Sequence, residues 1–234
     1  MDKPLFLALD FSTGELAKDF IQSHSLQGIP VKVGMELFYR EGPEIIQWLK
    51  NQGHHIFLDL KLHDIPHTVE KAMFNLAQLG VDMVNVHALG GSQMIQAAKR
   101  GLEKGAVQEL PKLVAVTLLT SMDEETLTNE LTIQSDIENT AEHLAVMARE
   151  NGADGVVCSA NEAGRIKQAC GQEFLTVTPG IRLLGSSAND QARIATPAFA
   201  RQNGADYLVI GRTVTKAEDP KQAYQQVVEE WTHA

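Results

Sequence analysis

The sequence predicts a single-domain (β/α)8 barrel, and three observations lead to this fold class. Eight short runs rich in Val, Ile and Leu alternate with segments that have helical periodicity. Most of the runs are continuously apolar, which is typical of parallel strands covered by helices. The length of 234 residues is close to the ~250 residues of a typical barrel of this kind. We therefore expect residues 1–234 to form one α/β domain.

The eight expected strands follow one another along the whole chain. They cover residues 5–10, 31–33, 56–61, 83–87, 113–118, 155–158, 175–178 and 207–210. Only the interval between the fifth and sixth strands is inflated, and it contains the polar stretch from Ser121 to Asp136. We predict an extended loop or lid in this stretch rather than a domain boundary.

Helix boundaries are marked by residues that cap or begin helices. The segment from Ser12 to Glu15 has the pattern of a capping box, which satisfies backbone N–H groups at a helix start. Prolines stand where a first helical residue belongs, and glycines follow apparent helix ends. These prolines are Pro43, Pro66, Pro197 and Pro220, and the glycines are Gly53, Gly80, Gly105, Gly152 and Gly204. The alternative fold, an open doubly wound sheet, is less favoured because no Gly-rich fingerprint follows the first strand.

The composition of the chain argues against several classes of binding partner. The formal net charge is −10, and the basic residues form no run, so nucleic acid is not expected as a partner. Only six apolar residues, from Pro4 to Leu9, precede Asp10, which is too few for a signal-peptide core, and no apolar stretch approaches membrane-spanning length. Neither cysteine has Cys or His neighbours at the spacing of a zinc site. We expect a cytoplasmic protein without a membrane partner.

Four charged residues on the first three strands are the main candidates for chemistry. Asp59 and Lys61 are two positions apart on one strand, so both side chains should point into the barrel, with leucines on the other face. Asp10 ends the first strand, and Lys32 lies within the second. Buried charges are costly unless paired or functional, and charges at the carboxyl ends of barrel strands usually line the active site. The alternative interpretation is a structural ion pair.

Alternating acids and lysines can all remain ionised. At ~4 Å and an effective dielectric constant near 20, an opposite-charge pair is worth about 4 kcal/mol before desolvation. Interleaved ammonium groups would keep the carboxylates anionic, and the carboxylates would keep Lys61 protonated. We hypothesise that Lys61 donates a proton to carbon.

A second constellation is suited to an anion. The segment from Val177 to Arg182 closes the seventh strand, and the segment from Val209 to Thr213 closes the eighth. Loops at these positions form the usual phosphate site of the fold. Glycine lets backbone N–H groups approach the phosphate closely, and arginine can donate two hydrogen bonds to it. The stretch from Leu183 to Gln191 could close over the phosphate. Ordinary glycine turns with exposed arginines are the alternative.

Histidine pairs raise the possibility of a metal, which the spacing does not favour. His54 with His55, and His63 with His67, lack a third ligand at motif spacing, and Pro66 interrupts a helix that would align the second pair. His87 ends the fourth strand, where we expect it to pack beside the site.

These motifs, in this order over nearly the whole chain, resemble those of the orotidine 5′-phosphate decarboxylase family in its compact bacterial form. The resemblance rests on the segments 7–10, 31–34, 57–65, 178–182 and 210–212. The Asp-x-Lys-x-x-Asp pattern that ends at Asp64 also occurs in related sugar-phosphate decarboxylases and aldolases, whereas Ile65, Pro66 and Thr68 favour the orotidylate branch. His67 stands where the family often has Asn.

The resemblance implies a role for each matching residue. Lys32, Asp59, Lys61 and Asp64 would form the catalytic array, with Asp64 and Thr68 reaching the site of a neighbouring subunit in a homodimer. Substrate would be bound by residues at the ribose, the pyrimidine and the phosphate. Asp10 would hold the ribose hydroxyls, Thr120 would contact the pyrimidine, and the phosphate would be held by Arg182, Gln191, Gly211 and Arg212. Lys32, Asp59 and Thr68 would also bind substrate.

The implied reaction converts orotidine 5′-monophosphate to uridine 5′-monophosphate and carbon dioxide, the last step of de novo UMP biosynthesis, with no cofactor. Two other functions stay open at this point. One is a metal-assisted sugar-phosphate decarboxylase or aldolase with the same barrel. The other is a non-catalytic binding module that has kept the phosphate loops, although such a module would be expected to have lost Lys61 or one of its aspartate partners.

Overall fold

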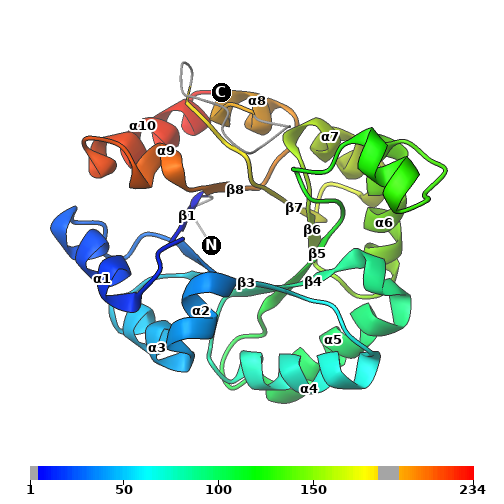
Figure 1. Ribbon diagram of the computed structural model, residues 1–234, viewed down its shortest axis with the longest axis horizontal. Coiled ribbons are helices and arrows are strands. Elements are labelled where there is room, and N and C mark those ends of the chain that lie inside the picture. The colour runs from blue at the N-terminus through cyan, green and yellow to red at the C-terminus, as the bar shows by residue number, and fades with distance from the viewer. Residues whose placement is uncertain (1–4, 184–194) are drawn as a thin grey trace.

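The computed structural model describes residues 5–183 and 195–234, and these form a closed barrel of eight parallel strands (Figure 1). The strands lie in chain order around the barrel, and β8 pairs with β1. They are β1 (Leu5–Ala8), β2 (Val31–Gly34), β3 (Ile56–Leu62), β4 (Met83–His87), β5 (Lys112–Val116), β6 (Gly155–Val157), β7 (Leu175–Thr178) and β8 (Tyr207–Ile210). The predicted fold and all eight predicted strands are confirmed, with ends that differ by at most two residues.

Helices surround the barrel as an outer ring (Figure 1). They are α1 (Gly14–Ser23), α2 (Met35–Glu41), α3 (Pro43–Asn51), α4 (Pro66–Ala77), α5 (Gly91–Gly105), α6 (Ile137–Glu150), α7 (Ala160–Cys170), α8 (Pro197–Gln202), α9 (Arg212–Thr215) and α10 (Pro220–Thr232). A 3₁₀ turn, η1 (Ala88–Gly90), precedes α5. Within the described ranges, no helix combines the length and apolar character that crossing a bilayer requires.

Helix ends agree with the sequence in part. All four prolines are first residues of helices, as predicted. The predicted capping box at Ser12 is wrong, because the N-cap is Thr13, whose hydroxyl accepts the Leu16 N–H at 3.2 Å. Gly105 does not follow a helix but is the last residue of α5, where a Cβ would lie 2.2 Å from the carbonyl oxygen of Phe74 on α4. That glycine allows two helices to pack closely.

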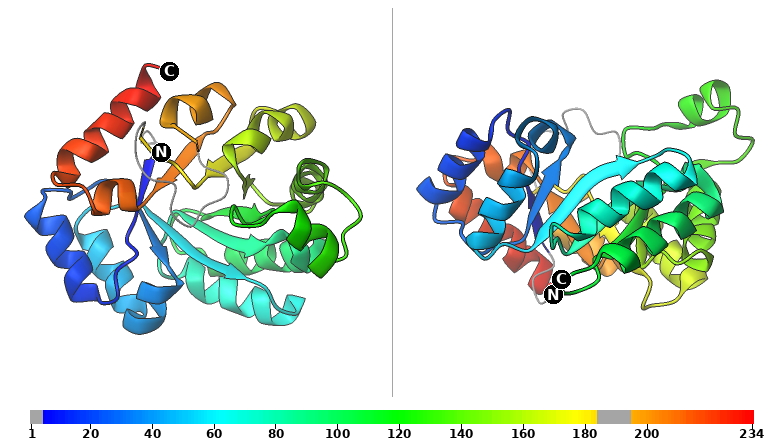
Figure 2. Two further views of the ribbon diagram at one scale, coloured as in Figure 1. Left: turned by 45° about the horizontal axis from the view of Figure 1, so that its top comes forward. Right: turned by 90° about the horizontal axis from the view of Figure 1, so that it is seen from below.

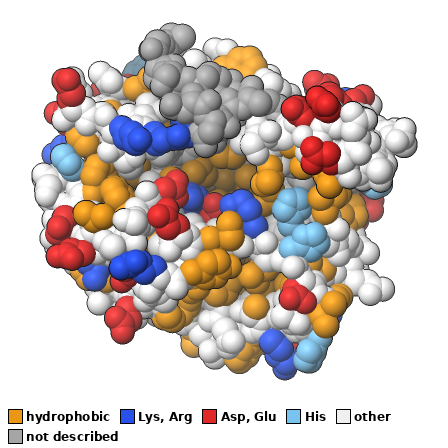
Figure 3. Space-filling view, in the orientation of Figure 1, with side chains coloured by type: hydrophobic (Ala, Val, Ile, Leu, Met, Phe, Trp, Pro, Cys, Tyr) orange, Lys and Arg blue, Asp and Glu red, His pale blue; other side chains and the backbone are white. Residues whose placement is uncertain are grey.

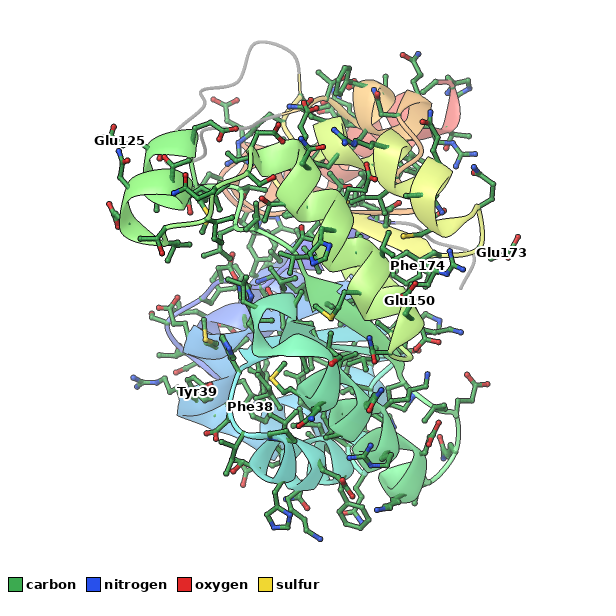
Figure 4. The ribbon with its side chains drawn as sticks, turned by 90° about the vertical axis from the view of Figure 1, so that its right-hand side faces the viewer. Phe38, Tyr39, Glu125, Glu150, Glu173 and Phe174 are labelled. Carbon is green, nitrogen blue, oxygen red and sulfur yellow. The ribbon has the colours of Figure 1, made fainter. Side chains whose placement is uncertain are left out.

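The segment between β5 and α6 is extended, as expected, but it is not only a loop. It contains the short π-helical segment η2 (Thr126–Glu130), in which Leu127 is fully buried. The right panel of Figure 2 shows this green segment projecting from one end of the barrel. Figure 4 places Glu125 in this segment at the same end as Tyr39 of α2, with Glu150 and Glu173 towards the other end. We call the first of these ends, where the strands finish, the mouth.

The barrel interior below the mouth is apolar. Inward-facing side chains form one cluster, in which the Phe6 ring packs at a tilt against Phe57 and Tyr207, with ring centroids 5.7 Å apart in each case. Its buried members are Phe6, Ala8, Phe57, Met83, Val114, Val177 and Val209. A larger apolar cluster fills the layer between strands and helices. The interior is therefore a packed core with a floor beneath the mouth, rather than a pore.

Three aspartates brace the opposite end of the barrel in the same way. Asp82, Asp154 and Asp206 each precede an even-numbered strand, and each carboxylate accepts a backbone N–H of the preceding odd-numbered strand at 2.7 to 2.8 Å. Each also contacts a basic side chain. The contacts are His55 with Asp82 at 2.7 Å, Lys99 with Asp154 at 2.9 Å and Lys167 with Asp206 at 2.6 Å. These hydrogen bonds hold neighbouring strands in register far from the mouth.

Candidate active site

A cavity of about 320 Å³ opens at the carboxyl ends of the strands, a size suited to a small-molecule ligand. Figure 3 shows the hollow at the centre of this face, where acidic and basic side chains meet beside hydrophobic ones. The lining includes eight of the residues that the sequence singled out. They are Asp10, Lys32, Asp59, Lys61, Thr120, Arg182, Gly211 and Arg212.

The charged residues at one end of the cavity form a continuous array. Lys61 Nζ lies 2.6 Å from Asp59 Oδ1, and Lys32 Nζ lies 3.4 Å from Asp59 Oδ2 and 2.9 Å from Asp10 Oδ1. The order is therefore acid, base, acid, base from Asp10 to Lys61. Gly34 leaves room for this array, because a Cβ there would lie 3.0 Å from Lys32 Nζ.

The array keeps its two most buried members ionised. Burial on its own would raise the pKa of the Asp59 carboxyl, but Lys32 and Lys61 outweigh it, and the pKa is lowered below its usual range. Burial would likewise lower the pKa of Lys32, but the neighbouring Asp59 and Asp10 outweigh it, and this pKa is raised. Both groups therefore carry their charges throughout the neutral pH range.

Lys61 occupies a bulge in β3. Leu58 pairs with Val84 and Leu62 with Val86, so four residue steps on β3 match two on β4. Within this bulge Lys61 has φ +50°, in the left-handed region, which costs a non-glycine residue about 1–2 kcal/mol. Both Asp59 and Lys61 do face the cavity as the sequence predicts, but the backbone that presents them is not a regular strand.

Asn85 on β4 is a site residue that the sequence reasoning missed. Its Oδ1 accepts the Lys61 N–H at 2.7 Å, and its Nδ2 donates to Asp59 Oδ1 at 2.7 Å. The side chain is buried, with 1% exposure. The only signal in the sequence is a single amide inside the apolar run from Met83 to His87.

The wall of the cavity after β7 and β8 is basic. Arg182, which follows β7, and Arg212, which follows β8, both line it, together with Gly180 and Gly211. Arg182 is buried, and its Nη1 donates to the carbonyl of Ile181 at 2.9 Å. Gln191 and the predicted closing stretch lie outside the described residues, apart from Leu183.

Asp64 and Thr68 are set apart from the array within one chain. Both are exposed, and neither is among the described residues that line the cavity. The Asp64 carboxylate accepts the N–H of Ile65 at 2.6 Å, at the start of α4. The geometry of a single chain therefore unites Lys32, Asp59 and Lys61 but not the fourth residue of the predicted array.

His63 and His87 stack beside the array, with ring centroids 5.6 Å apart. Burial lowers the pKa of His87, and the neighbouring His63 and Lys61 lower it further, so the ring is neutral at pH 7. His87 Nδ1 accepts the N–H of Leu89 at 3.4 Å, which agrees with a packing role. Across residues 5–183 and 195–234, no group of three or more His, Cys, Asp or Glu side chains is arranged to hold a metal ion.

The fold and the site together define a class: a (β/α)8-barrel enzyme whose cavity is lined by a lysine and aspartate array and by two arginines. Comparison with known proteins narrows this class. Residues 3–227 match the model of the orotidine 5′-phosphate decarboxylase / HUMPS family. The chain belongs to this family.

The similarity to relatives and to a solved structure extends over nearly the full length of this chain. The orotidine 5′-phosphate decarboxylase of Bacillus cytotoxicus is 52% identical over 99% of this chain and 98% of its own length. The protein of the same name from a Geobacillus species is 53% identical with the same coverage. The crystal structure of orotidine 5′-phosphate decarboxylase from Lactobacillus acidophilus superimposes with a TM-score of 0.87 at 44% identity, over 98% of this chain and 99% of that chain.

Proposed function

We propose that this chain decarboxylates orotidine 5′-monophosphate to uridine 5′-monophosphate and carbon dioxide, the last step of de novo UMP biosynthesis, with no cofactor. The observation that carries the proposal is the unbroken order from Asp10 through Lys32 and Asp59 to Lys61 in a cavity that is also lined by two arginines. Membership of the family over residues 3–227 supports it.

The substrate would lie in the cavity with its phosphate at the two arginines. Arginine forks and glycine backbone suit a phosphate dianion, so we assign the phosphate to Arg182, Gly211 and Arg212, and to Gln191 by family resemblance. We assign the ribose hydroxyls to the first part of the array and the pyrimidine to the opposite wall. The residues are Asp10, Lys32 and Asp59 for the ribose and Thr120 for the pyrimidine.

The chemical step would depend on Lys61. When the bond from C6 to the carboxylate breaks, its electron pair remains on C6, where no adjacent carbonyl can accept it. A preorganised ammonium group nearby stabilises that charge without reorganisation of solvent. Lys61 then transfers a proton from Nζ to C6, and the neutral amine regains a proton from solvent. Asp59, whose Oδ1 lies 2.6 Å from Nζ, fixes the position of the ammonium group before the step.

Binding of the phosphate would contribute to the rate although it is remote from C6. Interactions with a non-reacting part of a substrate can offset the cost of placing its reacting part against charged groups. Here the orotate carboxylate would have to approach the Asp59 carboxylate. We therefore assign Arg182 and Arg212 a share of the rate enhancement, and not only of the affinity.

We also propose a homodimer in which Asp64 and Thr68 complete the site of the partner subunit. Both are exposed at the mouth, near large apolar side chains that follow three adjacent strands. These are Met35 and Tyr39 after β2, Ile65 after β3, and Leu89 after β4, which are 43%, 68%, 66% and 40% exposed. Grouped exposed apolar side chains commonly mark protein interfaces. An Asp64 from the partner would extend the alternation of charges beyond Lys61.

Residues 1–234 would act as a single catalytic domain, since the described strands close one barrel. The cytoplasm would be its location, because its substrate and product are nucleotides of central metabolism and both of its cysteines are buried in the fold.

An absorbance assay tests the proposed reaction. Purified protein mixed with orotidine 5′-monophosphate should deplete the orotate chromophore and yield uridine 5′-monophosphate, equally with and without EDTA. Loss of turnover on chelation, or consumption of a ketose phosphate instead of orotidylate, would assign the chain to the metal-assisted branch. Binding of the nucleotide without any turnover would indicate a non-catalytic module.

A further inference from the structure

The bulge in β3 raises the question of what holds Lys61 in place. In the described residues only Ser25, Lys61 and Thr132 have a positive φ without being glycine, and only Lys61 lies within a strand. A left-handed lysine is less stable by about 1–2 kcal/mol than one in the β region, so surrounding contacts must maintain this conformation. A small change in φ would swing a long side chain away from the cavity.

The contacts that oppose such a change converge on Asn85. The bulge removes residues 59–61 from the register of β3 with β4, and the Asn85 carboxamide oxygen receives the Lys61 N–H at 2.7 Å. Because that N–H can only donate, Oδ1 of Asn85 must face it, and this fixes Nδ2 toward Asp59. The two hydrogen bonds therefore define one orientation of the amide.

Asn85 also acts on the ammonium end of Lys61. Its Nδ2 lies 2.7 Å from Asp59 Oδ1, the same oxygen that Lys61 Nζ contacts at 2.6 Å. One side chain thus fixes the backbone of Lys61 directly and its ammonium group through Asp59. Asn85 itself is not among the described residues that line the cavity, so it is placed to act through Lys61 rather than on substrate.

We propose that Asn85 is a positioning residue that locks Lys61 in its left-handed conformation and aims its ammonium group at C6 of the substrate. This inference rests on the proposed function of Lys61. Displacement of a reacting group by about 1 Å can cost on the order of 100-fold in rate. Loss of Asn85 should therefore weaken interactions with charge at C6 and spare those with the rest of the nucleotide.

Binding of two nucleotides separates positioning from general damage. The first is uridine 5′-monophosphate, and the second is an analogue that carries an anionic oxygen on C6. Replacing Asn85 with Ala should lower the affinity for the C6-anionic analogue by about 10- to 100-fold, and it should lower kcat/KM for orotidine 5′-monophosphate by a similar factor. Affinity for uridine 5′-monophosphate should change by less than about threefold. The proposal would be overturned if the variant lost affinity for both nucleotides equally, or for neither.

A double-mutant cycle tests whether Asn85 acts through Lys61 or only supports the structure. In a Lys61→Ala background, Asn85→Ala should have little further effect on binding of the C6-anionic analogue, because its target is gone. An undiminished effect in that background would contradict positioning through Lys61. If Lys61→Ala alone left turnover and analogue binding intact, the proposed function of Lys61 would fail instead.

Two further variants distinguish a loss of positioning from a loss of stability. Thr176→Val removes a buried hydroxyl from the opposite end of the barrel, where it donates to the Gly204 carbonyl at 2.9 Å; it should lower stability and leave catalysis unchanged. Asn85→Asp is nearly isosteric and keeps the acceptor for Lys61 N–H, but it sets a second carboxylate against Asp59. Should Asn85→Ala fail to fold, Asn85→Asp should show the same selective loss on the C6-anionic analogue, and an unaffected Asn85→Asp would overturn the proposal.

Discussion

The ammonium nitrogen of Lys61 lies 2.6 Å from Oδ1 of Asp59, although only one residue separates the two in the chain. Side chains two positions apart on a regular strand stand roughly 6.6 Å from one another. The long lysine side chain therefore reaches toward Asp59, from a backbone with φ +50°. The contact makes Asp59 the central group of the array, since its other oxygen faces Lys32 at 3.4 Å.

Replacing Asp59 with Asn should destabilise the fold in a pH-dependent way. The substitution leaves two ammonium groups in a buried site without the carboxylate between them, which should lower the free energy of unfolding at pH 7 by about 3 kcal/mol. Because the pKa of Asp59 is lowered in the folded protein, its contribution is present above the usual value of 3.8 and is lost as the pH falls through the folded-state value. Urea unfolding at several pH values measures this difference.

Asp19→Asn provides a matched control, since Asp19 is exposed on α1 and its replacement should change the unfolding free energy little. The difference between the Asp59→Asn variant and the unsubstituted protein should shrink below pH 3.8. A difference that stays constant through the acid range would show that Asp59 stabilises the fold by packing and not by charge.

Replacing Arg212 with Ala should impair catalysis in proportion to what the arginine does for the phosphate. Loss of a charge-assisted pair of hydrogen bonds should lower kcat/KM for orotidine 5′-monophosphate by about 100-fold or more. Orotidine, which lacks the phosphate, should react slowly and at the same rate with both proteins. Arg212→Lys keeps the charge but not the two-pronged hydrogen-bond donor, so its kcat/KM for orotidine 5′-monophosphate should lie between those of Arg212→Ala and the unsubstituted protein. An equal loss of kcat/KM with both substrates would show that Arg212 does not act through the phosphate.

Mixing two inactive variants tests whether the site is shared between subunits. Lys61→Ala and Asp64→Ala chains should each be inactive, whereas a hybrid dimer has one site that combines an intact Lys61 with an intact Asp64 of the partner. Equal mixing makes about half of the dimers hybrid, so about a quarter of all sites should recover. Native mass spectrometry would verify subunit exchange, and continued inactivity in verified hybrids would refute residue sharing.

Replacing Asp154 with Ala should lower stability without affecting the reaction. Asp154 accepts the Leu113 N–H at 2.8 Å and pairs with Lys99 at the end of the barrel opposite the mouth. Losing these charge-assisted bonds should cost about 2–3 kcal/mol, which lowers Tm by about 4–12 °C in a chain of this size. Asp154→Asn keeps an acceptor and should lose less. A kcat/KM that falls with Tm in both variants would show that this brace is coupled to the active site.

The strands and most of the array could be predicted because their signals are local. A continuous apolar run identifies each buried strand, and the spacing of Asp59 and Lys61 places both on one face. Asn85 could not be found in this way, since its role depends on the bulge that sets β3 against β4. The same limit explains Gly105, whose purpose is a contact with α4. Features that depend on two elements meeting are not encoded in either segment alone.

In the mechanism proposed for this chain, a preorganised ammonium group at Lys61 meets the negative charge that develops on C6 and then protonates that carbon. The most direct test is the rate of orotidine 5′-monophosphate decarboxylation by a Lys61→Ala variant that still binds uridine 5′-monophosphate. Loss of the charge and of the proton donor together should lower kcat/KM by about 10⁴-fold or more. A variant that keeps its affinity for the product and decarboxylates within about tenfold of the unsubstituted rate would contradict the mechanism.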